Sequence, residues 1–130
     1  MKKQGKKLLL ENHVVRFEYF EGVVFGTFKV KNIDKENALF SIESRIKATK
    51  KIPHSILIDI KNIKTVTKEA REIFSSEISF KYLKSTAILV KSPFSAAIAN
   101  LYLKINKPRG NVRIFPSEKM ALTWLKSRDF

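Results

Sequence analysis

The chain has 130 residues, of which 44% are hydrophobic and 29% charged, and it contains no cysteine. This length is typical of one domain, and the apolar share is enough for a core and too high for a disordered chain. The lack of cysteine excludes disulfides, thiolate metal sites and cysteine nucleophiles. No apolar run approaches the roughly 20 residues of a membrane span, and no signal-peptide core follows the N-terminus, so we expect a cytoplasmic protein.

The formal net charge is +14, which is large for a domain of this size. Such a field attracts nucleic acid, anionic lipid or acidic protein surfaces, and it also occurs as the background of a lysine-rich proteome. The charge therefore narrows the class of partner without defining a site.

The first part of the chain predicts a hairpin. Residues 1–12 are basic and are expected to form a flexible tail. Apolar and polar side chains alternate over residues 13–20, which is typical of a half-buried strand. Glu21-Gly22 is a turn signal, and residues 23–30 form the second strand.

The middle of the chain alternates helices and strands. Asp34 is placed to cap a helix that begins at Lys35. A nearly continuous apolar run over residues 54–60 predicts a third strand, covered on both faces. Thr67 is the expected N-cap of a second helix, with a buried stripe of Ala70, Ile73, Phe74 and Ile78.

The last third repeats this alternation. Residues 86–90 form a fourth strand, and Ser92-Pro93 is an N-cap followed by proline in the first helical turn. The stripe expected for this third helix is Ala97, Ile98, Leu101 and Ile105. Residues 112–115 form a fifth strand, and Ser117 caps a final helix.

The predicted order is β-β-α-β-α-β-α-β-α, an α/β fold with a mixed five-stranded sheet and helices packed on it. The opening hairpin is antiparallel, and the strands separated by helices should be parallel with right-handed crossovers. Residues 13–130 are expected to form a single domain.

One segment suggests a family. Leu57-Ile58-Asp59-Ile60 leads through Val66-Thr67 to Glu69-Ala70-Arg71, and it is followed by the strand Ala87-Ile88-Leu89-Val90. This arrangement resembles the STAS domain of anti-sigma-factor antagonists, and in particular uncharacterised bacterial STAS-like proteins. The resemblance implies a STAS-like fold and a non-enzymatic regulatory or protein-interaction module. In signalling STAS domains a serine in the corresponding loop is phosphorylated by a partner kinase.

This chain departs from the family at that loop. The positions that correspond to the phosphoacceptor motif are Thr67, Lys68, Glu69 and Ala70, and none is a serine. The departure argues against a phosphorylation switch there, although the hydroxyl groups of Thr65 and Thr67 are close.

Lysines gather at the same loops, which predicts an anion-binding or docking edge. Parallel strands place their carboxyl ends and the following helix N-termini on one edge, so the helices that start after Thr67 and Ser92 should begin near each other. Lys61, Lys64, Lys68 and Lys91 belong to these loops. A phosphate, lipid headgroup or carboxylate would suit them, and a solvated lysine rim is the alternative.

A wider basic surface is also present in the sequence. Seven basic residues and one acid lie between Arg45 and Lys68, and Lys104, Lys107, Arg109 and Arg113 form a second group. Nonspecific nucleic-acid binding would be salt-sensitive and usually needs stacking aromatics. The aromatic residues here mostly fall on predicted core faces, so a solvated basic face is favoured.

The candidates for catalysis and metal binding are weak. Asp59 would be a general base or ligand, but it is expected instead to accept a backbone N–H bond in the turn that follows. His13 and His54 are isolated, so no metal site, catalytic residue or cofactor is predicted.

The buried stripe predicted for the third helix does not require both Phe94 and Tyr102. They suit contact with another protein or a second copy of the chain, or the binding of an anionic lipid or small amphiphilic ligand. An apolar cavity near these two residues would favour a ligand carrier, and a closed surface would favour protein docking. The predicted partner- or ligand-binding residues are Lys61, Lys64, Thr65, Thr67, Lys68, Lys91, Ser92, Phe94 and Tyr102.

Overall fold

A six-stranded mixed sheet forms the centre of the protein, whose computed structural model describes residues 5–108 and 110–127. The sheet has the order β1-β2-β3-β5-β7-β8. Its strands are β1 (Lys7–Glu11), β2 (Val15–Phe20), β3 (Val23–Phe28), β5 (His54–Asp59), β7 (Leu83–Leu89) and β8 (Val112–Phe115). β1, β2 and β3 pair antiparallel, and β3, β5, β7 and β8 pair parallel.

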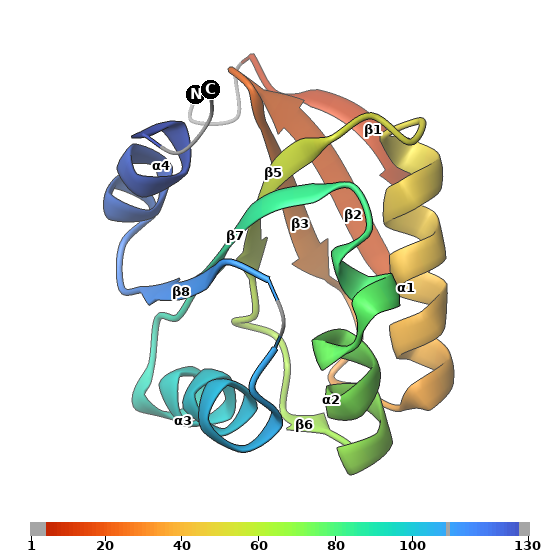
Figure 1. Ribbon diagram of the computed structural model, residues 1–130, viewed down its shortest axis with the longest axis vertical. Coiled ribbons are helices and arrows are strands. Elements are labelled where there is room, and N and C mark those ends of the chain that lie inside the picture. Colours follow the sequence, from red (N-terminus) through yellow and green to blue (C-terminus); the bar gives the residue numbers. More distant parts are fainter. Residues whose placement is uncertain (1–4, 109, 128–130) are drawn as a thin grey trace.

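The helices lie on both faces of this sheet (Figure 1). They are α1 (Lys35–Ala48), α2 (Lys68–Ser75), α3 (Pro93–Leu101) and α4 (Glu118–Ser127), with a 3₁₀ turn η1 (Glu77–Phe80) and a π-helical turn η2 (Tyr102–Asn106) that continues α3. Ala38 of α1, Ala70 of α2 and Ala99 of α3 belong to one hydrophobic core, whereas Ala121 and Leu125 of α4 belong to a second core on the other face.

The alternation of side chains along β5 divides these two cores. Ile56 lies in the core beneath α1, α2 and α3, and Leu57 lies in the core beneath α4. Successive side chains of a strand point to opposite faces, so an apolar residue at every position is needed when helices cover both. The prediction that this strand is covered on both faces is therefore confirmed.

The helix starts follow the predicted caps. The Asp34 carboxylate accepts a hydrogen bond from the Asn37 backbone N–H at 2.8 Å, and Thr67 Oγ1 accepts one from Ala70 at 3.1 Å. Ser92 Oγ accepts from the backbone N–H of Ser95 at 3.0 Å, and Ser117 Oγ accepts from Met120 at 3.1 Å. Each cap satisfies a backbone donor that the helix itself leaves free.

The expectation of a flexible tail over residues 1–12 is wrong for Lys7–Glu11, which form β1. This strand pairs with β2, and its register shifts between Leu8 and Leu10. The shift breaks the alternation by which strands are recognised, because an irregular register changes which side chains face the core. Leu9 and Leu10 pack against the core, so the sheet has six strands instead of five.

Two further short strands were not predicted. β4 (Asn32–Ile33) and β6 (Thr65–Val66) form a separate parallel pair. This pair holds the loop after β5 against the start of α1, with the backbone N–H of Thr67 bonded to the carbonyl of Ile33 at 3.0 Å.

The stripes of α2 and α3 differ from those expected. Ile78 belongs to η1 and is 51% exposed, because α2 already ends at Ser75. Of the stripe expected in α3, Ile98 packs against the core. Ala97 is instead exposed, and Leu101 and Ile105 are 42% and 65% exposed. The inward face carries Ser95, Ala99 and Tyr102, at a spacing of four and then three residues that places them on one side of a helix.

None of the helices in the described ranges combines the length and the apolar character that crossing a bilayer requires.

Candidate functional site

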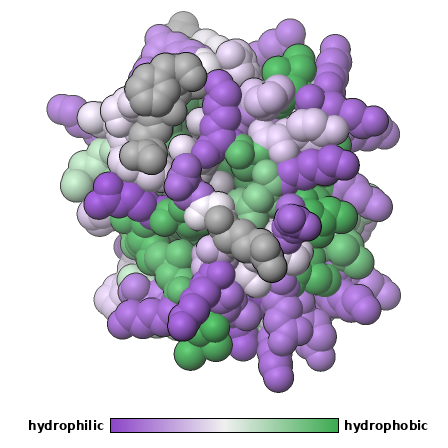
Figure 2. All heavy atoms as spheres, viewed as in Figure 1, coloured by the Kyte–Doolittle hydropathy of each residue, from purple (hydrophilic) through white to green (hydrophobic). Residues whose placement is uncertain are grey.

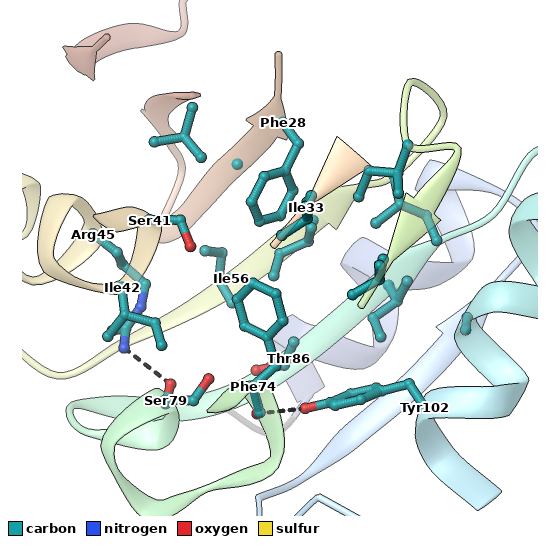
Figure 3. Close-up of a pocket in the computed structure, with 18 of the residues that line it drawn as sticks. Phe28, Ile33, Ser41, Ile42, Arg45, Ile56, Phe74, Ser79, Thr86 and Tyr102 are labelled. Atoms are coloured by element: carbon teal, nitrogen blue, oxygen red, sulfur yellow. Dashed lines mark hydrogen bonds between the residues drawn. The ribbon is translucent and has the colours of Figure 1, made fainter. Parts of the chain in front are cut away.

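An apolar cavity of about 130 Å³ lies between the sheet and the helices α1, α2 and α3, and we call it the central cavity (Figure 3). Its apolar walls include Phe28, Ile33, Ile42, Ile56, Ile58, Phe74, Ile88 and Ile98. An engineered protein cavity of roughly 150 Å³ with a similar lining is known to stay dry and to bind benzene. The central cavity therefore has room for an apolar group about the size of one benzene ring.

Small residues on two sides leave this space open. Ala99 on α3 and Gly26 on β3 both line the cavity, and neither fills it. A methyl group at Gly26 would lie 3.1 Å from the Phe17 ring, so glycine lets that ring pack closely on the strand. The sequence has a small residue at these two positions, where a larger apolar side chain would fill the space as in a close-packed core.

A buried arginine forms a polar patch on the cavity wall. Arg45 is 4% exposed and projects from α1 toward η1. Its Nη1 donates to the Lys81 carbonyl at 3.0 Å and lies 3.1 Å from His54 Nε2, and its Nη2 donates to the Ser79 carbonyl at 3.0 Å. Burial lowers the pKa of Arg45 to about 10, because removal from water disfavours its charged form.

The partners of Arg45 include no acid among the described residues. A buried charge usually has an ion-pair partner, since neutral acceptors compensate the lost hydration only in part. The arginine is therefore held in place by its neighbours but is not neutralised by them.

His54 is held as the neutral ring by its two contacts. Its Nδ1 lies 2.8 Å from the carbonyl of Ile52, an acceptor, so this nitrogen carries the hydrogen. Its Nε2 then accepts the hydrogen bond from Arg45. Burial lowers the pKa of His54, and the positive charges of Arg45 and Lys84 lower it further, while the bond to Ile52 acts in the opposite direction.

Two hydroxyl groups also face the central cavity. Tyr102 donates to the carbonyl of Phe74 at 2.7 Å and is thereby fixed in the wall, and burial raises its pKa. Thr86 is 5% exposed, and its Oγ1 is buried without a hydrogen-bond partner in the described structure. Figure 3 shows Arg45 and Ser79 together on one side of the cavity, Thr86 beside Phe74 and Tyr102, and Phe28 next to Ile33.

The lysine edge, which comprises Lys61, Lys64, Lys68 and Lys91, is only partly assembled. Asp59 lies 3.9 Å from both Lys61 Nζ and Lys91 Nζ, and its other oxygen accepts from the backbone N–H of Lys61 at 2.9 Å. The structural role expected for Asp59 is therefore confirmed. Lys64 and Lys68 are exposed on the β6–α2 side.

The two helix N-termini do not meet as predicted. Arg71, in the first turns of α2, donates to Asn106 at 3.2 Å, and Asn106 lies at the far end of the helix that begins at Pro93. At a rise of about 1.5 Å per residue, Asn106 lies roughly 20 Å along that helix from Pro93, so α2 begins near its far end. Figure 1 shows α2 and α3 on opposite sides of β6. One anion cannot contact both helix ends.

The predicted hydroxyl groups have structural partners. Thr65 Oγ1 donates to Asn32 Oδ1 at 2.7 Å, and it joins β6 to β4. Thr67 and Ser92 are the helix caps described above. Of the two aromatic residues, Phe94 is 54% exposed and does not line the central cavity, whereas Tyr102 does.

One member of the predicted basic surface is not exposed, because Arg45 is buried. Arg109 lies outside the described residues. Figure 2 shows the face of the molecule seen in Figure 1. Hydrophilic side chains surround its rim, and apolar patches lie over α3 and near η1. Within the described ranges, no group of three or more His, Asp or Glu side chains is arranged to hold a metal ion.

The sequence-based prediction missed Arg45 and Thr86 as cavity residues. A signal for Arg45 is nevertheless present, because it follows Ile42 by three residues and Ala38 by seven and so shares their helical face. For Thr86 the sequence carries no such signal, since threonine is common on strands.

Comparison with solved structures confirms the predicted STAS-like fold. The chain is similar to an uncharacterised protein of the DUF3478 family from Shewanella loihica PV-4, whose crystal structure has a SpoIIAA-like fold. The TM-score is 0.57 and the identity 16%, with 92% of this chain and 94% of that chain covered. At this identity the similarity establishes the fold alone.

Comparison with proteins of curated function found no match. Residues 16–129 match the family described as a domain of unknown function, DUF7793, and because this match spans most of the chain, the protein belongs to the DUF7793 family.

Proposed function

We propose that this protein is a non-enzymatic regulatory module whose central cavity binds a small apolar or amphiphilic molecule. The observation that carries the proposal is the cavity itself, which is lined mainly by aliphatic and aromatic side chains with a few polar groups. Small-molecule sites commonly combine such an apolar lining with a few placed polar groups. The predicted non-enzymatic character fits this role, because binding requires no nucleophile or base.

The size of the cavity restricts the ligand. At about 130 Å³, it has room for a single ring or a short branched chain, but not for the acyl chains of a membrane lipid. The proposal is therefore narrower than the lipid carrier considered from the sequence, and it favours small metabolites or signalling molecules.

Toluene is a suitable neutral probe of the cavity. We expect a titration followed by ¹H–¹⁵N NMR to shift the resonances of residues that line the cavity, including those around Ala99 and Ile56. Ala99→Leu should abolish these shifts, because the larger side chain occupies the cavity. Ala121→Leu is the matched control, since Ala121 is equally buried but belongs to the core beneath α4.

The control variant should still bind toluene, even though overpacking of that core destabilises it by about 1–3 kcal/mol. The proposal would be wrong if wild-type protein showed no localised shifts, or if Ala99→Leu left them unchanged.

A second candidate is docking to an acidic protein surface through the lysine edge. The observation in its favour is that Lys61 and Lys91 share one carboxylate, Asp59, so the edge keeps a net positive charge. Phe94, which is exposed and follows Lys91 by three residues, would add an apolar contact. Such charge complementarity acts mainly on association rate and partner choice.

Charge reversal tests this second candidate. Lys64→Glu/Lys68→Glu and the control Lys47→Glu/Lys119→Glu change the net charge equally, and all four lysines are exposed. In pull-downs from the native host, the first variant should lose partners that the control retains. Equal recovery by both variants would show that the edge is not a docking surface.

A further inference from the structure

The spare hydrogen-bonding groups of the central cavity indicate which chemical class it selects. Arginine has five N–H donors, and the contacts of Arg45 with His54, Ser79 and Lys81 use three of them. Two donors of Arg45 are thus without a partner among the described residues. The Thr86 hydroxyl, which lines the same cavity, is also unpaired.

The nearby carbonyls already accept at least one hydrogen bond each. The carbonyls of Ser79 and Lys81 accept from Arg45, and the carbonyl of Phe74 accepts from Tyr102. The cavity therefore offers unpaired donors together with a buried positive charge. A ligand complements these groups best if its polar end is an acceptor with a negative charge.

We propose that the ligand is a small monocarboxylic acid, whose carboxylate binds Arg45 and accepts a hydrogen bond from Thr86 while its apolar body fills the central cavity. This inference rests on the proposed function. Arg45 and Thr86 both line this cavity, together with the apolar side chains of Phe28 and Ile33 (Figure 3).

The physical reason is that the ligand and the cavity each satisfy polar groups that the other leaves unpaired. The carboxylate supplies the counter-charge that the described neighbours of Arg45 do not provide, and it satisfies the Thr86 hydroxyl. Hydrogen bonds to a charged group stabilise a complex by about 1.5–3 kcal/mol, which is roughly tenfold or more in affinity. A neutral molecule of the same shape would leave the positive charge uncompensated.

Benzoate, benzyl alcohol and toluene test the inference, because they share a ring and differ in the polar group. Titration calorimetry at neutral pH should show that wild-type protein binds benzoate about tenfold or more tightly than benzyl alcohol. Thr86→Val, which keeps the side-chain shape and removes the hydroxyl, should reduce this preference several-fold while toluene affinity stays unchanged.

The salt dependence of benzoate binding distinguishes the cavity site from adsorption to the basic surface. A partly buried ion pair is screened less than exposed charges, so the benzoate preference should persist in about 0.5 M salt. Benzoate should also shift the NMR resonances of the same cavity residues as toluene, because both occupy one site.

The outcomes are distinguishable. If toluene binds but benzoate and benzyl alcohol bind equally, the preference for acids is refuted and the cavity function stands. If Thr86→Val leaves the preference at its wild-type value, or if salt removes the preference, the assigned head-group site is wrong. If none of the three probes binds, both the inference and the proposed function fail.

Discussion

Arg45 Nη1 lies 3.1 Å from Nε2 of His54, and both side chains are buried, at 4% and 7% exposure. The pair joins the C-terminal half of α1 to the start of β5, next to the segment that leads into β7. Because His54 donates to Ile52 through Nδ1, only its neutral form can also accept from the arginine. Protonation of the histidine would remove this bond and place two positive charges side by side.

This relationship predicts a loss of stability in acid. The pKa of His54 is lowered from its ordinary value of 6.5, chiefly by burial, with Arg45 and Lys84 adding to the effect. The unfolded chain therefore takes up this proton at a higher pH than the folded protein does. The free energy of unfolding should fall as the pH is lowered through 6.5, until the folded form is protonated as well.

Urea unfolding at a series of pH values between about 7.5 and 5 measures this dependence. His54→Gln does not titrate and retains an acceptor for Arg45, so its free energy of unfolding should change less over the same range. A parallel decrease in the wild type and His54→Gln would show that other groups govern the acid sensitivity.

Tyr102→Phe should destabilise the protein through the carbonyl that it leaves unpaired. Tyr102 donates to the Phe74 carbonyl at 2.7 Å, and this bond links η2 to the end of α2. Because the Phe74 carbonyl is only partly buried, loss of its donor should cost about 1 kcal/mol, the lower end of the range for a buried acceptor. Urea unfolding should show this decrease, while Tyr19→Phe, at a side chain that is 43% exposed, should change the free energy of unfolding by less than about 0.5 kcal/mol. Similar values for the two variants would contradict the role assigned to this bond.

The first strand provides a test of its own contribution to the core. Leu10 is partly buried against the core, whereas Leu8 on the same strand is 49% exposed. Leu10→Ala should lower the free energy of unfolding by about 1–2 kcal/mol, less than the 2–5 kcal/mol of a fully buried leucine. Leu8→Ala should be close to neutral in the same denaturation experiment. If Leu10→Ala were also neutral, β1 would contribute little to stability.

The local features of the fold were predictable because they depend on residues close in sequence. Asp34, Thr67 and Ser92 each accept a hydrogen bond from the backbone three residues later, so a capping pattern identifies them. Asp59 bonds to the backbone two residues later, and its structural role was predicted for the same reason.

The errors arose where packing overrides a local pattern. The α3 stripe was placed on Ala97, Ile98, Leu101 and Ile105. Of these Ile98 packs against the core, and the helix otherwise turns Ser95 and Ala99 inward. Ser95 is 2% exposed and bonds to the backbone of Lys91 and Ser92, so a polar residue is satisfied in the core position. Hydrophobicity alone therefore identified only part of the inward face of this helix.

The sequence by itself determined the class of fold, the starts of the helices and the concentration of lysines after β5, all of which follow from periodicity, capping and composition. Only the tertiary structure decided where the candidate site lies. Arg45 of α1 bonds to Ser79 and Lys81, which are 34 and 36 residues away in the sequence. Thr86 lines the same cavity from strand β7. Such contacts depend on strand register and helix packing, which bring distant segments together and which no local pattern specifies.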